Sequence, residues 1–515
     1  MEAYFAFRSV DSVNSHTSTL PALLSPLNRH EIAHMQHLFT RLAPDQCTHH
    51  DDGNPMPSRM HVDVDILGVG MGPANLCLAI ALDEVRQRRS APVITHFIEK
   101  KTRFSWHAPM LLDGARMQIS FLKDLVTLRN PLSRFSFINY LNEQGRLLDF
   151  VNRNTFHPSR REFDNYLRWA AAHFSDQCSY GESVQKISKN PCNDGIRVES
   201  MTMQGVAKMY NARAVVIAAG STAHIPDAFQ PTVNAPNVIH SSGYLDQLST
   251  LDLPKSGPRR IAVIGAGQSA AEIFLDLYRR FPDADLEMLH RGVALRQSDS
   301  SPFVNRIFDP AFVDFFYQQD AHFKQQLIAS CKHTNYGAVD SHLLESISNI
   351  LYQDKVQGGD KRQIKPFSII EKTRYGENGR IDIRYSHTDK ESAWHAYDLV
   401  ILATGYMKSE TACQSILDES LRDFTIDRNY RICCDRFGQL PIYVQGASEA
   451  QHGLSDTLLS NMASRAGSIS ESLVDLVSRQ QTAPEKTNLS RAFVPPYSYD
   501  PPNGSRDMTV NEHSR

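Results

Sequence analysis

Two glycine-rich segments, one in each half of the chain, constrain the fold more than any other feature of the sequence. Each follows a short apolar run and precedes an apolar stretch with helical spacing. The first contains Gly68, Gly70, Gly72 and Pro73, and the second contains Gly265, Gly267, Gln268 and Ser269. Glycines let a backbone turn sharply and approach a pyrophosphate, and the helix that follows points its N–H groups at the phosphates. This context predicts two dinucleotide-binding units, against the alternative of two ligand-free turns in an α/β protein.

The residue that ends the next strand of each unit indicates which nucleotide the unit binds. An apolar strand over 93–98 ends in Glu99, whose carboxylate can accept hydrogen bonds from the ribose hydroxyls of FAD or NAD. A strand over 286–290 ends in Arg291, a cation that suits the 2′-phosphate of NADP. The alternative for both residues is a charged strand end in contact with water. We therefore expect FAD in the first unit and NADPH in the second.

Two later strands, over 214–220 and 399–406, also end in glycine, and the second carries Thr404 and Gly405. Because that strand follows the whole second unit, we expect the first unit to be interrupted and then completed near residue 400. The expected fold is α/β, with two nested Rossmann-like dinucleotide-binding domains for FAD and NADPH plus a small helical substrate-binding segment. The expected boundaries are a partly disordered leader over 1–60, an FAD-binding domain over 61–250 and 397–480, an NADPH-binding domain over 257–300 and 358–396, the helical segment over 301–357, and a disordered tail over 481–515.

The composition argues against several other classes of protein. Lys and Arg number 54 against 57 Asp and Glu, and this net charge of −3 gives no support for nucleic-acid binding. An uncharged and largely apolar run, Ile66 to Leu82, contains several glycines and is shorter than the roughly 20 residues of a spanning helix, so we expect no membrane insertion. The eight cysteines form no C-x-x-C pair and no export signal is evident, which indicates a reduced, cytoplasmic protein. No metal site is predicted.

Further motifs follow in order along the chain. They are 117–125 (Met-Gln-Ile-Ser-Phe-Leu-Lys-Asp-Leu), Asp299 with 302–305 (Pro-Phe-Val-Asn), 334–336 (Thr-Asn-Tyr), 403–406 (Ala-Thr-Gly-Tyr) and 452–460 (His-Gly-Leu-Ser-Asp-Thr-Leu-Leu-Ser). With the two glycine segments, this series resembles the class B flavin monooxygenases, and within them the N-hydroxylating L-ornithine N5-monooxygenases of siderophore biosynthesis. Pro73 and Ala270 replace the third glycine of each fingerprint, and both replacements are usual in this branch.

The resemblance implies an enzyme that hydroxylates a primary amine with FAD, NADPH and O2. NADPH would reduce FAD, O2 would add to the reduced flavin, and the side-chain amine of L-ornithine would attack the distal oxygen of the C4a-hydroperoxyflavin. The product would be N5-hydroxy-L-ornithine. The flavin supplies the reactive chemistry, and the protein supplies binding, orientation and exclusion of water. The resemblance also suggests a homo-oligomer, a tetramer or a dimer.

The resemblance assigns four residues to the substrate. Lys123 is expected to bind the amino-acid carboxylate, Asn305 and Asn335 its backbone end, and Ser460 the region of the amine or flavin; Asn335 is also expected to touch NADP. Each has a plain alternative: Lys123 as a solvated charge on an amphipathic helix over 121–125, Asn305 as a helix cap, and Asn335 as a turn residue. The apolar spacing within 301–357 predicts a helical lid that forms the pocket.

The resemblance assigns five residues to the cofactors. Gln118 corresponds to a glutamine beside the flavin and its oxygen adduct, so we expect a catalytic role for it as for Asn335 and Ser460. Trp106 and His107 are expected to flank the flavin. Gln268 and Arg291 are expected to contact NADP.

The substrate amine must be neutral to act as a nucleophile. A lysine-like amine has a pKa near 10.4, so its deprotonation at pH 7 costs about 4.6 kcal/mol. A poorly solvated pocket lowers that cost. We therefore expect a rate that rises from pH 7 toward about pH 9.

Other functions stay open at this point. A lysine N6-monooxygenase needs a pocket one methylene longer, a difference of only about 1–3 kcal/mol. A sulfur- or ketone-oxidising flavin monooxygenase needs no carboxylate anchor, so Lys123→Ala would leave its KM nearly unchanged. A disulfide oxidoreductase needs a redox cysteine pair. A non-catalytic NADP sensor or scaffold would not consume NADPH with any amine.

Overall fold

The described residues of this computed structural model are 60–90, 92–191, 195–252, 257, 259–387, 391–407 and 409–482. The leader expected over 1–60 and the tail expected over 481–515 therefore lie outside the described residues, apart from the backbone of Met60, Gln481 and Thr482 at their inner ends.

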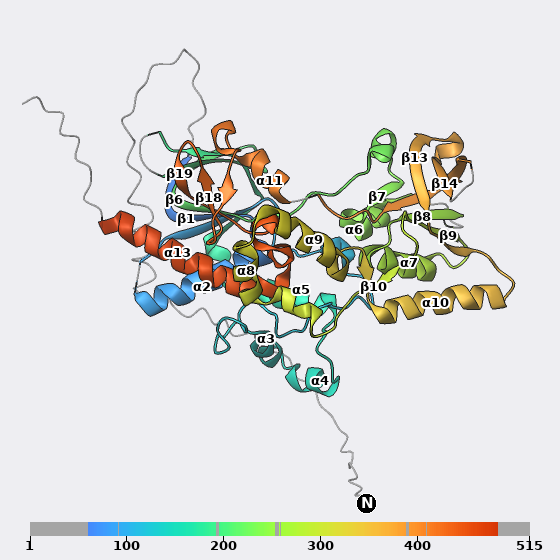
Figure 1. Ribbon diagram of the computed structural model, residues 1–515, viewed down its shortest axis with the longest axis horizontal. Coiled ribbons are helices and arrows are strands. Elements are labelled where there is room, and N and C mark those ends of the chain that lie inside the picture. Colours follow the sequence, from blue (N-terminus) through green and yellow to red (C-terminus); the bar gives the residue numbers. More distant parts are fainter. Residues whose placement is uncertain are drawn as a thin grey trace, which may run out of the picture. The chain divides into compact units, whose positions relative to one another are not determined.

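The first glycine segment follows the central strand of a nine-stranded sheet (Figure 1). β1 (Met60–Val69) pairs in parallel with β2 (Thr95–Glu99) and with β6 (Ala207–Ile217). Residues 64–69 of β1 are all buried, as expected for a parallel strand covered on both faces. The order is β17-β18-β19-β6-β1-β2-β3, and β5 pairs with both β4 and β6. The other strands are β3 (Cys178–Tyr180), β4 (Glu182–Lys189), β5 (Ile196–Thr202), β17 (Thr425–Ile426), β18 (Arg431–Cys434) and β19 (Gly438–Val444).

Helix α2 (Pro73–Arg89) follows the first glycine segment and packs against α13 (Met462–Thr482). Leu76, Leu78 and Ile80 are fully buried although they point in different directions round the helix, as expected when a helix is covered on more than one side. The same core contains residues of α3 (Phe137–Glu143), α4 (Leu147–Asn152) and α5 (Arg160–Ala172). These helices follow the loop that carries most of the predicted flavin and carboxylate contacts.

The second glycine segment belongs to a five-stranded parallel sheet, ordered β12-β9-β8-β16-β7. Its strands are β7 (Val238–His240), β8 (Arg260–Ile264), β9 (Asp285–Leu289), β12 (Arg362–Lys365) and β16 (Leu399–Leu402). Helix α6 (Tyr244–Thr250) comes after β7, and α7 (Gln268–Arg280) follows β8. Met110, Leu112 and Ala115 pack into the core of this unit, although their chain segment lies between β2 and α3. An apolar contact therefore joins the two nucleotide units.

Two predicted domain boundaries need correction. Strands β7 and β16 fall within 61–250 and 397–480, the ranges expected for the FAD-binding domain, yet both pair in the second sheet. The chain returns to the first sheet only afterwards, with β17 to β19. A short, wholly apolar strand such as β16 suits the interior of any parallel sheet, so its hydrophobic pattern does not indicate which sheet it joins.

The segment over 301–357 is largely helical, as predicted, but it divides into two parts. The first part, η5 (Val304–Phe308), α8 (Pro310–Tyr317) and α9 (Ala321–Asn335), contacts α12 (Glu449–His452) and η8 (Leu454–Thr457) near the C-terminal motif. The second part, α10 (Ser341–Val356), packs on α7 through Ile347. Helix α10 therefore belongs to the core of the second unit, and only η5, α8 and α9 are placed to act as the expected lid.

The chain also forms an antiparallel sheet of β13 (Ser368–Tyr375), β14 (Ile381–His387) and β15 (Ala393–Tyr397), whose core is shared with the second sheet. None of the helices in the described ranges is long and apolar enough to cross a membrane. The remaining elements are η1 (Ala108–Met110), η2 (Ser175–Gln177), η3 (Asp227–Thr232), η4 (Ser241–Gly243), β10 (Arg296–Gln297), β11 (Ala338–Val339), η6 (Glu377–Gly379), α11 (Ser409–Ile416), η7 (Glu419–Leu421) and η9 (Leu459–Asn461).

Candidate cofactor and substrate site

The two glycine turns have matching geometry. Gly70 has φ +84° and Gly265 has φ +142°, values that favour glycine. A Cβ atom on Gly70 would lie 2.5 Å from the carbonyl oxygen of Ala218, and one on Gly265 would lie 2.3 Å from that of Ala403. Ala218 follows β6 and Ala403 follows β16, the strands beside β1 and β8. Each turn is therefore closed against the end of its neighbouring strand, and a Cβ on Gly68 would likewise collide with the ring of Phe97.

Glu99, the predicted ribose acceptor, is buried at the end of β2 and also holds the first glycine turn. Its Oε2 accepts a hydrogen bond from the backbone N–H of Met71 at 2.8 Å, and its Oε1 accepts one from that of Lys101 at 2.9 Å. A carboxylate has about four acceptor positions. The carboxylate of Glu99 can therefore still accept hydrogen bonds from ribose hydroxyls.

The space before α2 is open, whereas a Cβ on Gly267 before α7 would lie 3.6 Å from the Cα of Gly337. A Cβ on Gly72 would meet no atom within 4 Å, and Gly72 is the N-cap of α2 with Pro73 at the helix start. Gly267 is the N-cap of α7, and Gln268 and Ser269 form its first turn. The first N–H groups of a helix lack acceptors within the helix, and its dipole favours an anion there. The residues present fit a dinucleotide at both turns.

Of the two predicted NADP contacts, the side chain of Arg291 is free to bind a ligand and that of Gln268 is not. Arg291 is exposed just beyond β9, and no ion pair engages it within the described part of the chain. The side chain of Gln268 is already engaged, because its Nε2 donates to Oε1 of Glu272 and its Oε1 accepts from the backbone N–H of Asp340, both at 2.9 Å. A direct side-chain contact of Gln268 with NADP would require it to leave these partners.

The Ala-Thr-Gly-Tyr segment joins the ends of the two sheets. Oγ1 of Thr404 donates to the carbonyl oxygen of His224 at 2.5 Å, and the N–H of His224 donates to that of Gly405 at 3.0 Å. His224 follows β6 of the first sheet, whereas Thr404 follows β16 of the second. The strand ends that carry the two glycine turns are therefore linked by one side-chain and one main-chain hydrogen bond.

An ion pair between a partly buried arginine and a buried glutamate joins the same two units. Nη1 of Arg160, at the start of α5, donates to Oε2 of Glu272 on α7, and Nη2 donates to Oε1, both at 2.8 Å. Nη1 also donates to the carbonyl oxygen of Met110 at 2.9 Å. Neither residue belongs to a predicted site, because nothing in a single sequence pairs positions 112 residues apart.

Lys123 lies in a turn rather than on the alternative amphipathic helix. The buried carboxylate of Asp124 holds this turn by accepting from the backbone N–H groups of Val126 at 2.9 Å and Phe137 at 2.8 Å. Burial raises the pKa of Asp124 despite these hydrogen bonds. Nζ of Lys123 lies 5.9 Å from the centre of the Phe308 ring, and no carboxylate of the described residues pairs with it. Its charge is therefore available to an anionic ligand.

Asn305 belongs to the same short helix, η5, as Phe308, the residue whose ring centre lies 5.9 Å from the Lys123 ammonium. Nδ2 of Asn305 donates to the carbonyl oxygen of Ser300 at 3.0 Å, which leaves its Oδ1 without a partner in the described chain. Asn335 ends α9, and its side chain lies outside the described residues.

Ser460 is buried in η9, directly before α13. In the same stretch, three buried side-chain atoms of other residues have no hydrogen-bond partner among the described residues: Oγ of Ser448, Nδ1 of His452 and Oδ1 of Asn461. Buried polar atoms are rarely left unpaired in folded proteins. This concentration of unpaired atoms is consistent with a ligand beside the C-terminal motif.

The predicted flavin contacts Gln118, Trp106 and His107 lie on the long loop between β2 and α3. Gln118 is exposed, and its side chain has no partner within the described ranges. His107 has φ +47°, and its ring lies 5.0 Å from that of Trp106 in an edge arrangement. The backbone N–H of Trp106 donates to Oδ1 of Asp164 at 3.1 Å. These contacts order the loop, while contact with the flavin stays a prediction.

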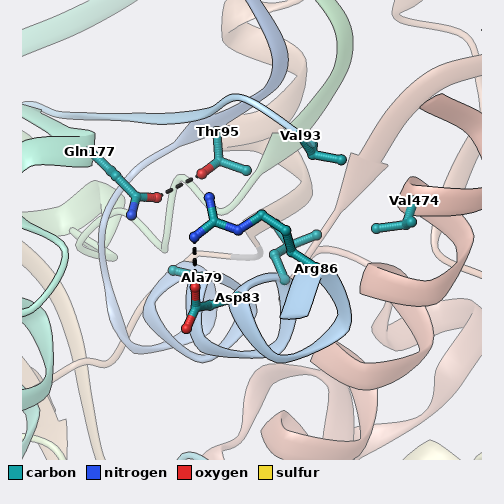
Figure 2. A pocket seen from close by; sticks show the side chains of 8 residues that line it. Ala79, Asp83, Arg86, Val93, Thr95, Gln177 and Val474 are labelled. Carbon is teal, nitrogen blue, oxygen red and sulfur yellow. Dashed lines mark hydrogen bonds and ion pairs between the residues drawn. The ribbon is translucent and has the colours of Figure 1, made fainter. Parts of the chain in front are cut away.

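A small pocket lies on the other side of the first unit, between α2, β2 and α13 (Figure 2). Arg86 pairs with Asp83 beside it, and Thr95 donates to Gln177 at 2.7 Å. Thr95 is the first residue of β2, whereas Glu99 at the glycine turn is the last. The pocket therefore lies at the N-terminal ends of the strands, whereas the candidate site lies at their C-terminal ends. The described residues contain no cluster of His, Cys, Asp or Glu that could hold a metal ion.

The paired sheets and linked glycine turns define a two-dinucleotide flavoprotein oxidoreductase. A family model described as L-lysine 6-monooxygenase/L-ornithine 5-monooxygenase matches residues 63–408, and the chain belongs to this family. An L-ornithine N(5)-monooxygenase of Pseudomonas aeruginosa is 40% identical over 414 residues, which cover 79% of this chain and 93% of that protein. A relative of the same name from Burkholderia cepacia is 40% identical over 401 residues, 76% of this chain and 89% of that protein.

Solved structures give the same result. Ornithine hydroxylase (PvdA) from Pseudomonas aeruginosa is 39% identical, with a TM-score of 0.76 over 81% of this chain and 100% of that one. The ornithine N-hydroxylase KtzI of Kutzneria sp. 744, solved with reduced FAD, NADP+ and L-ornithine, is 35% identical, with a TM-score of 0.75; the match covers 82% of this chain and 100% of that one. An L-lysine 6-monooxygenase from Pseudomonas syringae is 30% identical, with a TM-score of 0.68 over 80% and 100%.

Proposed function

We infer that this protein is an FAD- and NADPH-dependent L-ornithine N5-monooxygenase that forms N5-hydroxy-L-ornithine for hydroxamate siderophore biosynthesis. The observation that carries this inference is the ammonium of Lys123, which no carboxylate of the described residues pairs with, beside the helix that contains Asn305. The strand ends that carry the two dinucleotide turns are linked by hydrogen bonds in the same chain. The relatives named for ornithine, at 35% to 40% identity, support the choice of substrate.

We propose that each cofactor is held mainly by backbone groups. Gly68, Gly70, Gly72 and Pro73 with Glu99 would hold FAD, and Trp106, His107 and Gln118 would flank its ring. Gly265, Gly267, Ser269 and Arg291 would hold NADPH, while Gln268 would act mainly by positioning α10. Thr404 and Gly405 would fix the position of the NADPH site relative to the FAD site. A flavin held there would supply the redox chemistry, with NADPH as the reductant and O2 as the source of the one oxygen atom added to the amine, the other leaving as water.

We propose that the substrate is oriented from both ends. The ammonium of Lys123 would bind the carboxylate of ornithine, and Asn305 and Asn335 would hold its α-amino end. Ser460 would lie near the reacting amine, in a stretch where buried polar atoms lack partners. A poorly solvated site of this kind favours the neutral amine, which is the form that can attack oxygen.

Lysine is the second candidate substrate, because the family description includes a lysine 6-monooxygenase and one such structure is 30% identical. The two can be separated with the purified holoenzyme by a hydroxylamine assay that supplies L-ornithine or L-lysine with NADPH. The proposal expects ornithine to have the higher kcat/KM by about 10- to 200-fold, the range that one methylene contributes. Equal values, or a preference for lysine, would overturn the choice of ornithine.

We propose further that the FAD-binding domain comprises the first sheet with its helices, and that the NADPH-binding domain comprises the second sheet, including β7 and β16. We propose a cytoplasmic location, supported by the six described cysteines, all of which are free thiols.

A homo-oligomer, a dimer or tetramer, is supported by exposed apolar side chains near α3 and α4, such as Leu132, Leu148 and Val151. Light scattering of the purified protein would measure the state, and a monomer would contradict it.

A further inference from the structure

A chain of four buried polar side chains connects the first glycine turn with the segment that carries Ser460. Its members come from four places in the sequence: Asn75 on α2, Gln445 after β19, Asp456 in η8 and Arg465 on α13. We propose that these four residues form a positioning relay that fixes the C-terminal motif relative to the flavin cradle. They would not touch the reacting atoms themselves.

The first half of the relay holds the glycine turn. Nδ2 of Asn75 donates to the carbonyl oxygens of Gly70 at 2.7 Å and Val69 at 3.2 Å, at the point where the chain turns. Oδ1 of Asn75 accepts from Nε2 of Gln445 at 2.9 Å. The backbone N–H of Gln445 donates to the carbonyl oxygen of Ile217 on β6, so Gln445 is itself fixed to the sheet.

The second half holds the C-terminal motif. Nε of Arg465 donates to Oε1 of Gln445 at 3.3 Å. Nη1 of Arg465 donates to the carbonyl oxygen of Asp456 and pairs with its Oδ1 at 3.2 Å. Oδ2 of Asp456 accepts from the backbone N–H of Ser448 at 2.7 Å. Ser448 and Asp456 thus fold the chain back on itself immediately before Ser460.

The ion pair within the relay indicates a role other than stability. The side chains of Arg465 and Asp456 are 3% and 0% exposed, and a pair so deeply buried loses its hydration. Such a pair is often no more stabilising than apolar residues of the same size. What it supplies is fixed geometry, because a guanidinium directs its N–H groups along set directions. Here they point to Gln445 on one side and to Asp456 on the other.

Two variants separate the two halves of the relay. Gln445→Leu cuts the links to Asn75 and to Arg465 and keeps the ion pair, so we expect the Kd for FAD to rise about tenfold and the KM for ornithine to rise less than in the double variant below. Asp456→Leu with Arg465→Met replaces the pair by apolar side chains of similar size. For this double variant we expect both the Kd for FAD and the KM for ornithine to rise about tenfold, while kcat changes much less.

A control removes an ion pair that is less deeply buried, that of Arg362 and Asp354, whose side chains are 13% and 7% exposed. Arg362 begins β12, at the sheet edge away from the glycine turns. We expect Arg362→Met with Asp354→Leu to leave the Kd for FAD and the KM for ornithine unchanged. The Kd is measured by titrating the apo-protein with FAD and following flavin fluorescence, which does not depend on turnover.

The relay is overturned if its variants lower the free energy of unfolding while the Kd for FAD and the KM for ornithine stay at wild-type values. If the double variant does not fold, Arg465→Lys keeps a charge for Asp456 but loses the contact of Nε with Gln445, and a wild-type Kd for FAD in Arg465→Lys would also overturn the relay. The ornithine measurement rests on the proposed function. The FAD titration does not rest on it. If the enzyme does not hydroxylate ornithine, the Kd for FAD of the variants still tests the relay.

Discussion

Arg160 and Glu272 form a bidentate ion pair that joins helix α5 of the first unit to helix α7 of the second, with both N–O distances at 2.8 Å. Glu272 also accepts from Gln268 at the start of α7, so one carboxylate links the FAD half of the chain to the predicted NADPH turn. The relative position of the two nucleotide turns therefore depends on a charge pair as well as on apolar packing.

Removal of one member of this pair should destabilise the fold. Glu272→Ala leaves the partly buried guanidinium of Arg160 without its counter-charge, and we expect the free energy of unfolding to fall by about 3–5 kcal/mol. Urea unfolding followed by circular dichroism measures this. The control is Asp113→Ala, because Asp113 pairs at 3.6 Å with the neighbouring Arg161 in an exposed position. The Asp113 variant should match the wild type, and equal effects of the two changes would contradict a special role for Arg160.

Loss of the predicted carboxylate anchor should weaken binding more than chemistry. Lys123→Ala removes a charge-assisted contact worth about 1.5–3 kcal/mol, which corresponds to roughly a 10- to 150-fold rise in the KM for ornithine. The KM for NADPH should stay constant. Both KM values are measured by steady-state kinetics. The control variant is Lys372→Ala, which removes an exposed lysine on β13 and should leave the KM for ornithine unchanged. An unchanged KM for ornithine in Lys123→Ala would favour a substrate without a carboxylate.

The coenzyme preference should depend on Arg291. Arg291→Ala removes the exposed cation beyond β9, so we expect the KM for NADPH to rise about tenfold or more while the KM for NADH changes little. The ratio of kcat/KM for the two coenzymes is the relevant measurement. A variant that loses activity equally with both would show that Arg291 does not recognise the 2′-phosphate.

His452 should make the fold sensitive to acid. It is fully buried, its ring is stacked on Tyr430 with ring centres 4.0 Å apart, and burial lowers its pKa to about 4. Because the unfolded histidine has a pKa near 6.5, only the unfolded chain binds this proton between about pH 4 and pH 6.5, so acid favours unfolding. The wild type should lose up to about 1.4 kcal/mol more per pH unit in this window than His452→Phe. Parallel stability curves for the two proteins would contradict this assignment.

The rate of hydroxylation should rise with pH. The side-chain amine of free ornithine is charged at pH 7, and more of it becomes nucleophilic as pH approaches about 9. Product formation at saturating NADPH, measured as kcat/KM from pH 7 to 9, tests this. A flat profile would count against an amine as the reacting group.

The sequence was most informative where local pattern and chemistry coincide. The strand, glycine turn and helix around Gly70 and Gly265 were predictable, because both the turn and the phosphate site depend on residues close together in sequence. The acidic end of β2 and the basic end of β9 were predictable for the same reason, and the structure places Glu99 and Arg291 at those ends.

Relationships between distant segments could not be predicted. The apolar strand β16 carries no signal for the sheet that it joins, so its place between β8 and β7 was missed. Gln445 meets Asn75 across 370 residues, and no periodicity or spacing links two such polar side chains. Helix α10 has the apolar spacing of a lid helix and of a core helix alike, and only its contact with α7 decides between them.

The most direct test of the account is the fate of O2 in a reaction of the purified holoenzyme with NADPH and L-ornithine under 18O2. Mass spectrometry of the amino-acid product should find the heavy isotope bound to the side-chain nitrogen of ornithine, with one NADPH consumed for each product. The account would be contradicted if NADPH were oxidised while ornithine stayed unlabelled and all of the heavy oxygen appeared as hydrogen peroxide or water.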